Sequence, residues 1–128
     1  MTIIRDISKT PPSSETLIRV YRAGQVSFSR AAAKLLCLED GAKVAFVFGK
    51  VTSDLVMPYV TRRDSLAYKV TRNGGQFRIR SKALCESLAG ELDGYGTYRI
   101  EPENAEKDMN GNVYYPIFFR NLNKSYAD

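Results

Sequence analysis

The chain has 128 residues, of which 44% are hydrophobic and 26% charged, and its formal net charge is +5. These values are typical of a globular domain with its own core and exclude a disordered chain. No apolar run approaches the roughly 18 residues of a membrane span, and the first residues lack the apolar segment of a signal peptide. We therefore expect a soluble, cytoplasmic protein with no membrane partner.

Residues 1–15 combine prolines and serines with other polar residues and predict a flexible arm. Residues 16–128 are expected to form a single compact domain. In its first half, alternating hydrophobic and polar residues predict strands, and a short helix is expected after Ser29, whose hydroxyl can cap it. The expected strands are Leu17–Tyr21, Val26–Ser29, Lys43–Phe48 and Leu55–Thr61. Pro58 predicts an edge position or a bulge for the last strand, because proline cannot donate a ladder hydrogen bond.

The second half is expected to contain the same kinds of element. Its predicted strands are Ser65–Arg72, Gln76–Arg80, Gly96–Ile100 and Val113–Arg120. Asn73-Gly74-Gly75 is typical of a hairpin turn, and Ser81 can cap a helix over Lys82–Leu92. Glu101–Asn112 is expected to be a polar loop, and residues 121–128 a short tail. The predicted fold class is therefore α+β, mainly antiparallel strands with two short helices.

The two halves also resemble each other in pattern. The segment VYRAGQ at 20–25 matches VTRNGGQ at 70–76 with one insertion, and Pro58 matches Pro116. The order strand, strand, helix, strand, strand occurs over residues 16–61 and again over 65–120. We therefore predict a tandem repeat with pseudo-two-fold symmetry.

Charge is unevenly distributed along the chain. From Arg62 to Lys82 there are seven basic residues and one acid, whereas from Glu86 to Asp108 there are seven acids and two bases. Such segregation predicts one face suited to a polyanion such as DNA. The alternative is that both blocks are ordinary solvated faces of strands and loops. The candidate nucleic-acid-binding residues are Arg22, Arg30, Arg62, Arg63, Arg72, Arg78, Arg80 and Lys82.

Catalytic chemistry is not indicated. The chain has no histidine, which removes the commonest general base and zinc ligand. Cys37 and Cys85 fall in or just after predicted helices, which favours buried free thiols. No glycine loop of the phosphate-binding type is present, and the acids of Glu101–Asp108 are typical of a solvated loop. We expect no enzyme, no metal, no cofactor and no small-molecule substrate.

A strand, a short helix, an acidic residue with glycine and a second strand follow one another between Gly24 and Phe48. The positions that carry this pattern are Gly24, Val26, Ser27, Phe28, Ala32, Leu35, Leu36, Leu38, Glu39, Gly41, Val44 and Phe46. The segment resembles the DNA-binding unit of the SpoVT/AbrB-like family, in which two copies interleave as swapped hairpins and basic residues contact DNA. The resemblance implies DNA contacts from Arg22 and Arg30. In the second half it implies contacts from Arg72, Arg78 and Lys82.

Three functional hypotheses follow. The first is a non-enzymatic, regulatory or architectural DNA-binding protein that contacts phosphates. The second is a structural or protein-interaction component without nucleic-acid binding, whose basic strip faces an acidic partner or its own Glu101–Asp108 loop. The third is a single-stranded nucleic-acid-binding protein that uses Tyr and Arg on the sheet, although tyrosines of strands more often pack in the core.

Self-association to a dimer or higher oligomer is also predicted. Pro58 and Pro116 suggest open sheet edges, which soluble proteins need to cover. Apolar residues that lie on or beside those edges are Leu55, Met57, Val60, Ile117 and Phe119. The alternative is that the two halves cover each other within one chain.

Overall fold

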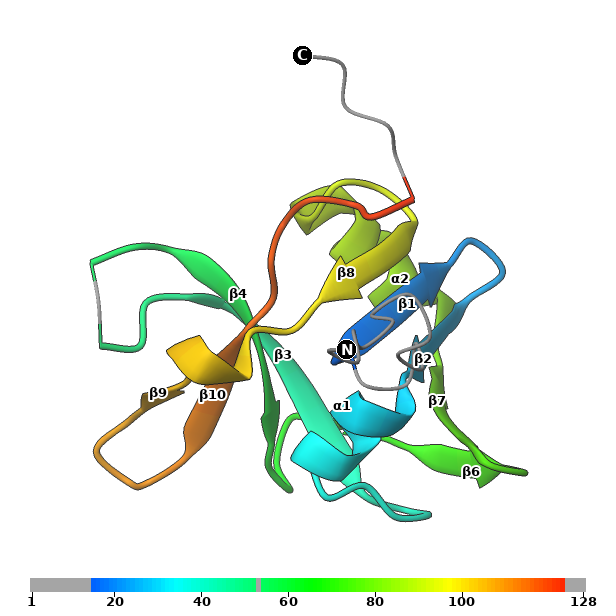
Figure 1. Ribbon diagram of the computed structural model, residues 1–128, viewed down its shortest axis with the longest axis horizontal. Coiled ribbons are helices and arrows are strands. Elements are labelled where there is room, and N and C mark those ends of the chain that lie inside the picture. Colours follow the sequence, from blue (N-terminus) through cyan, green and yellow to red (C-terminus); the bar gives the residue numbers. More distant parts are fainter. Residues whose placement is uncertain (1–14, 53, 124–128) are drawn as a thin grey trace, which may run out of the picture.

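The computed structural model describes residues 15–52 and 54–123, and Figure 1 shows its elements. They are β1 (Leu17–Tyr21), β2 (Gln25–Phe28), α1 (Arg30–Leu35), β3 (Lys43–Gly49), β4 (Met57–Arg62), β5 (Tyr68–Lys69), β6 (Thr71–Asn73), β7 (Gln76–Arg80), α2 (Lys82–Glu91), β8 (Gly96–Arg99), the 3₁₀ helix η3 (Pro102–Asn104), β9 (Glu106–Lys107) and β10 (Val113–Pro116). The predicted α+β class, mainly antiparallel with two short helices, is confirmed. The predicted N-terminal arm, apart from Glu15, lies outside the described residues.

The strands form two five-stranded sheets. Sheet A has the order β6-β7-β2-β1-β8, and sheet B has the order β5-β3-β4-β10-β9. Between β5 and β6, the Val70 N–H donates to Ala42 O and the Val70 carbonyl accepts from the Gly41 N–H, so the same chain segment passes from one sheet to the other. On the opposite side, Ile100 and Ile117 form an antiparallel bridge. The two sheets are therefore joined at both sides and enclose the core.

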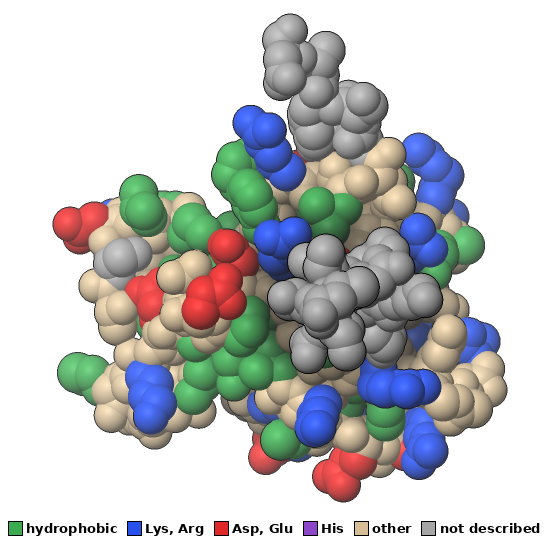
Figure 2. Space-filling model, viewed as in Figure 1, with side chains coloured by type: hydrophobic (Ala, Val, Ile, Leu, Met, Phe, Trp, Pro, Cys, Tyr) green, Lys and Arg blue, Asp and Glu red, His purple; other side chains and the backbone are tan. Residues whose placement is uncertain are grey.

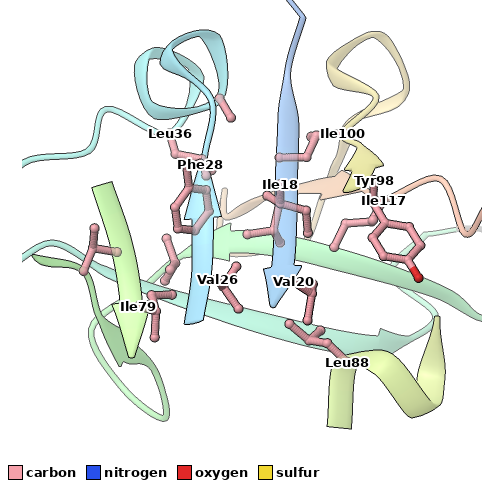
Figure 3. Close-up of a cluster of buried hydrophobic side chains, with 14 of the residues drawn as sticks. Ile18, Val20, Val26, Phe28, Leu36, Ile79, Leu88, Tyr98, Ile100 and Ile117 are labelled. Atoms are coloured by element: carbon pink, nitrogen blue, oxygen red, sulfur yellow. The ribbon is translucent and has the colours of Figure 1, made fainter. Parts of the chain in front are cut away.

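The core follows from the alternation of side chains along the strands. Ile18, Val20, Val26 and Phe28 point inward from β1 and β2, and each is at most 6% exposed. Figure 3 shows these side chains gathered with Ile79 of β7 and Leu88 of α2. Sheet B, α1 and the residues near them complete the cluster with Val44, Val60, Ile117, Ala32 and Leu36. With one face of each strand committed to this core, the other face of sheet A is left outward.

Both predicted helix caps are confirmed. The Ser29 hydroxyl accepts the Ala32 N–H at 3.2 Å, and the Ser81 hydroxyl accepts the Leu84 N–H at 3.1 Å. Ser29 also accepts the Leu17 N–H at 2.9 Å, which ties the start of α1 to β1. These caps fix where each helix leaves sheet A, because they satisfy backbone donors that lack partners within the helix.

Three predicted elements differ from the structure. The expected strand Ser65–Arg72 bends at its start and is divided into β5 and β6, because it changes from sheet B to sheet A at Val70. The expected loop Glu101–Asn112 contains η3 and β9. The expected strand Val113–Arg120 ends at Pro116, after which the Phe118 N–H donates to Arg99 O beside β8.

The prediction that Pro58 and Pro116 mark sheet edges is wrong. β4 lies between β3 and β10, and β10 lies between β4 and β9. The two proline strands pair with each other, and Pro116 lies opposite Tyr59 at the end of their short ladder, where a missing N–H interrupts few bonds. Val60 and Ile117, expected near an interface, are 0% exposed. The argument for self-association from open sheet edges therefore fails, and self-association stays a prediction.

The interpretation of both cysteines as buried thiols is half right. Cys85 of α2 is buried among core residues, and this burial raises the pKa of its thiol. Cys37 is exposed, because the chain turns out of α1 there with a positive φ of 52°.

The two halves of the chain are interleaved. Sheet A contains β1 and β2 beside β6 and β7, and sheet B contains β3 and β4 beside β10. In the β2–β7 pair, Val26 lies opposite Ile79 and Phe28 opposite Phe77. The sequence match aligns Val26 with Phe77 and Phe28 with Ile79, so a two-fold axis would exchange these two pairs. The register agrees with the predicted repeat, which itself stays a prediction.

Candidate nucleic-acid interface

The strands of sheet A are rich in arginine and contain no acid, although Glu15 and Glu103 line a hollow together with Arg99 at one end of the sheet. The five strands of this sheet contain Arg19, Arg72, Arg78, Arg80 and Arg99, and neither Asp nor Glu. Cross-strand partners share a face, and Arg19 lies opposite Ser27, which lies opposite Arg78. Val20, Val26 and Ile79 point inward. Their neighbours along the strands, Arg19, Ser27 and Arg78, therefore point outward.

Arg78 lies at the centre of the outward face and is half-buried. Its Nη1 donates to the Gln25 Oε1 at 3.3 Å, while its Nε is buried and has no hydrogen-bond partner among the residues that the structure describes. A guanidinium that has lost part of its water without gaining a carboxylate partner is costly. An anion arriving at the exposed side of this group would restore favourable charge interactions.

Arg19 is held next to Arg78 by uncharged neighbours. Its Nε donates to the Thr97 Oγ1 at 3.0 Å, and its guanidinium carbon lies 5.6 Å from the Tyr21 ring centroid. A hydroxyl and an aromatic ring restrict the side chain without cancelling its charge. The positive charge is therefore positioned and still available to a partner.

Further basic residues lie at one end of this face, where the β1–β2 turn meets the start of α2. The Ser81 N–H donates to Gly24 O at 3.0 Å, and Arg22 lies 4.6 Å from the Tyr95 ring centroid. Gly24 is required here, because its φ is +101° and a Cβ would lie 3.2 Å from the Lys82 Cα. A shallow hollow of about 430 Å³ is lined by Ala23, Gly24, Gln25, Arg80, Ser81 and Lys82.

A second hollow, of about 480 Å³, lies across the same face. Its lining comprises Leu17, Ile18, Arg19, Tyr21, Ser27, Phe28, Ser29, Arg30, Gln76 and Thr97. Arg30 is exposed at the first position of α1. Among the outward residues, Ser27 and Thr97 have short side chains between longer neighbours, which explains the concave shape.

Three residues predicted for the interface lie elsewhere. Arg62 of β4 donates from Nη1 to Leu36 O at 3.0 Å and to Cys37 O at 2.6 Å, so it caps the carboxyl end of α1. Arg63 donates from Nε to the Ser65 carbonyl at 3.0 Å in the following bend. Arg72 shares the inward side with its cross-strand partner Phe77, 5.9 Å from that ring centroid.

Of the predicted set, Arg78 and Arg80 thus lie on the outward face, Arg30 lines the hollow across it, and Arg22 and Lys82 lie where the β1–β2 turn meets the start of α2. The structure adds Arg19 and Arg99, which sequence reasoning missed. The alternation of Arg19 with Ile18 and Val20 was a usable signal. Arg99 lies opposite Leu17 on the outward face, but it falls in the acid-rich part of the sequence and its charge was therefore overlooked.

Tyrosines contribute little to the outward face. Tyr59 and Tyr98 are 0% exposed. The Tyr98 hydroxyl accepts the Asp93 N–H at 2.8 Å and donates to Gly94 O at 2.5 Å, and burial raises its pKa to about 12. Among the outward residues of sheet A, Tyr21 is the aromatic one, with 37% exposure. A platform of stacked bases would need more exposed rings than this.

Some acidic residues lie beside sheet A: the Asp40 Oδ1 accepts the Arg72 N–H at 3.0 Å, and Glu15 and Glu103 line a hollow with Arg99. Others gather over η3 and β9. Figure 2 shows Asp and Glu on the left of the view, over the region of η3 and β9, and also at the lower edge; Lys and Arg lie mainly on the right, with one group at the lower left. Glu106 connects β9 to the β3–β4 hairpin, because its carboxylate accepts hydrogen bonds from Thr52 and Tyr59. The segregation seen along the sequence is therefore present in part on the surface.

In the part of the chain that the structure describes, no helix is long and apolar enough to cross a membrane. No protein-family model matches the chain, and neither a curated protein nor a solved structure was found to be similar to it. The resemblance to the SpoVT/AbrB-like unit therefore stays a prediction.

Proposed function

We propose that this protein binds DNA, in a regulatory or architectural role without catalysis, through the outward face of sheet A. The observation that carries the proposal is the set of arginines on strands that contain no acid. Arg19 and Arg78 are positioned by Thr97, Tyr21 and Gln25, which are all uncharged. DNA phosphates are the polyanion that such an array suits, since each neutralised phosphate releases a counterion.

Phosphate contact explains features of the site that a solvated strand face leaves unexplained. A purely solvated face has no need to bury part of a guanidinium, as it does at Arg78. The start of α2 adds the positive end of a helix dipole beside Arg80 and Lys82. The proposal assigns no role in binding to Arg62, whose donors are engaged by the carbonyls at the end of α1.

The proposal is tested by fluorescence anisotropy with a labelled duplex of about 20 base pairs over a salt series. We expect the logarithm of the binding constant to fall linearly with the logarithm of salt concentration. Arg19→Gln and Arg78→Gln should each reduce the slope by about 0.9. Lys43→Gln is the matched control, because Lys43 is exposed on β3 of sheet B.

Two results would reject the proposal. One is the absence of duplex binding at roughly 20 mM salt, where electrostatic contacts are strongest; this would favour the protein-interaction hypothesis. The other is an equal loss for Lys43→Gln and Arg78→Gln, since binding would then depend on net charge and not on this face. A preference for single strands that is lost in Tyr21→Ala would favour the third hypothesis.

A further inference from the structure

We infer that the arginines of sheet A form a diagonal track that binds one phosphodiester backbone of a DNA duplex over about four nucleotides. The inference rests on the proposed function and adds the path, length and sequence independence of the contact. It comes from the register of four neighbouring strands, β7, β2, β1 and β8. The track residues are Arg80, Arg78, Arg19 and Arg99.

The register places these residues in sequence across the sheet. Arg80 lies opposite Gln25 of β2, and Arg78 lies two residues further along, opposite Ser27. Arg19 of β1 also lies opposite Ser27. Arg99 of β8 lies opposite Leu17, two residues beyond Arg19 in the same direction. The line therefore advances along the strands while it crosses from β7 to β8.

The spacing follows from sheet geometry. With about 3.3 Å per residue along a strand and about 4.8 Å between strands, Arg80 and Arg78 are roughly 7 Å apart. The same values place Arg78 and Arg19 roughly 10 Å apart, and Arg19 and Arg99 roughly 8 Å apart. The whole track spans about 20 Å between Cα positions. One DNA strand carries a phosphate every 3.4 Å or so of helix axis, but because the backbone winds around that axis its consecutive phosphates are roughly 7 Å apart, so this length corresponds to about four phosphates.

The surroundings of the track favour a backbone over bases. Ser27 lies between Arg78 and Arg19, and Thr97 lies beside Arg19; both line the shallow hollow of this face. A rounded backbone fits such a hollow, and these short hydroxyl side chains do not extend to the base edges of a duplex. Tyr21 is the aromatic residue of the outward face, and Arg19 already lies against its ring. We therefore expect little dependence on base sequence.

The test uses hairpin-capped duplexes with stems of 3, 6, 9 and 12 base pairs and the chain of 128 residues. The unaltered protein should gain affinity steeply up to about four base pairs, hence between the stems of 3 and 6, and then only in proportion to the number of available positions. The double variant Arg80→Gln/Arg99→Gln removes both ends of the track. Its salt slope should fall by about 1.8, and its steep gain between the stems of 3 and 6 base pairs should be lost.

The matched control is Arg72→Gln/Lys43→Gln, which removes the same charge from positions off the outward face. It should retain the slope and the length dependence of the unaltered protein. Thermal unfolding of both double variants establishes that each is folded before binding is compared. An equal loss in the control, or an unchanged length dependence in Arg80→Gln/Arg99→Gln, would overturn the track.

The outcomes also separate the track from the function it rests on. If the unaltered protein binds no stem of any length, the proposed function itself fails. If it binds duplexes but Arg80→Gln/Arg99→Gln behaves as the control variant does, DNA binding stands and the track is wrong. Tighter binding to a six-nucleotide single strand than to the six-base-pair stem would also overturn the inference, because stacking would then outweigh the backbone contact.

Discussion

Gly96→Ala should lower the melting temperature of this protein strongly. Gly96 is the position of β8 against which Asn121 of the C-terminal segment packs. Its φ is +153°, a conformation that side chains rarely adopt. An added Cβ would lie 2.1 Å from the Asn121 Oδ1 and 2.5 Å from its Cγ. Asn121 is 2% exposed, and its Nδ2 donates to Tyr95 O at 2.6 Å and to Asp93 O at 3.2 Å.

The magnitude follows from these contacts. Backbone strain costs about 1–3 kcal/mol, and each buried group that loses its partner costs about 1–3 kcal/mol more. A total of about 3–5 kcal/mol is a large part of the 5–15 kcal/mol typical of a domain. At roughly 3–5 °C per kcal/mol for this size, the melting temperature should fall by about 10–20 °C.

The assay is thermal unfolding followed by circular dichroism. Gly75→Ala is the control, since no atom lies within 4 Å of a Cβ added there. The clash and the lost bonds involve the same pair of residues. The double variant Gly96→Ala/Asn121→Ala should therefore be less destabilised than the sum of the single variants. A Gly96→Ala protein as stable as Gly75→Ala, or full additivity in the double variant, would refute the reasoning.

Further predictions concern pH and the arginine that caps α1. Burial raises the pKa of Tyr98 to about 12, so the stability from its neutral hydroxyl is complete below pH 10 and is lost as pH rises through about 12. Urea unfolding at pH 8–12 should show this fall in the free energy of unfolding. Tyr98→Phe should make that free energy depend less on pH over the same range. Hydrogen bonds from Asn112 lower the pKa of Asp108 below 3.8, so its stabilising effect is present above that pH and is lost in more acidic solution. The protection of the Asn110 and Asn112 amides, measured as exchange relative to an unstructured peptide at the same pH, should therefore fall in acid, and Asp108→Asn should remove this dependence. Arg62→Ala should lower the free energy of unfolding by about 1–2 kcal/mol in urea titrations without changing the salt slope of DNA binding.

The sequence predicted the elements better than it predicted their neighbours. Alternation located β1 and β7, and hydroxyl caps located both helix starts, because these signals are local. Which strands pair is decided by tertiary packing, so Pro58 was assigned to an edge although β4 is paired on both sides. The function of Arg62 depends on carbonyls more than 20 residues away, and no local pattern contains that information.

The candidate site, too, was predicted where local signals sufficed and missed where tertiary packing decides. A count of charges along the chain found Arg78 and Arg80, because they fall in a basic stretch. The count also selected Arg72. This residue follows Thr71, which lies on the outward face opposite Arg78, and it therefore points to the other side of the sheet. It missed Arg99, which reaches the face only because β8 pairs with β1. Whether an arginine lies on the interface is therefore decided by the alternation along its strand and the register between strands, more than by local charge density.

The predicted repeat and the proposed track lead to one further step. In the alignment of the two halves, Ser27 and Ser29 of the first half correspond to Arg78 and Arg80 of the second. A two-fold axis between β2 and β7 would make these positions structurally equivalent, as the register of that pair allows. Equal arginines in both halves would place guanidinium groups opposite each other at the centre of sheet A, where they would repel. Small hydroxyl residues in one half avoid that repulsion and leave the hollow beside the track. The capacity to bind a backbone would then come from the positions at which two otherwise similar halves differ.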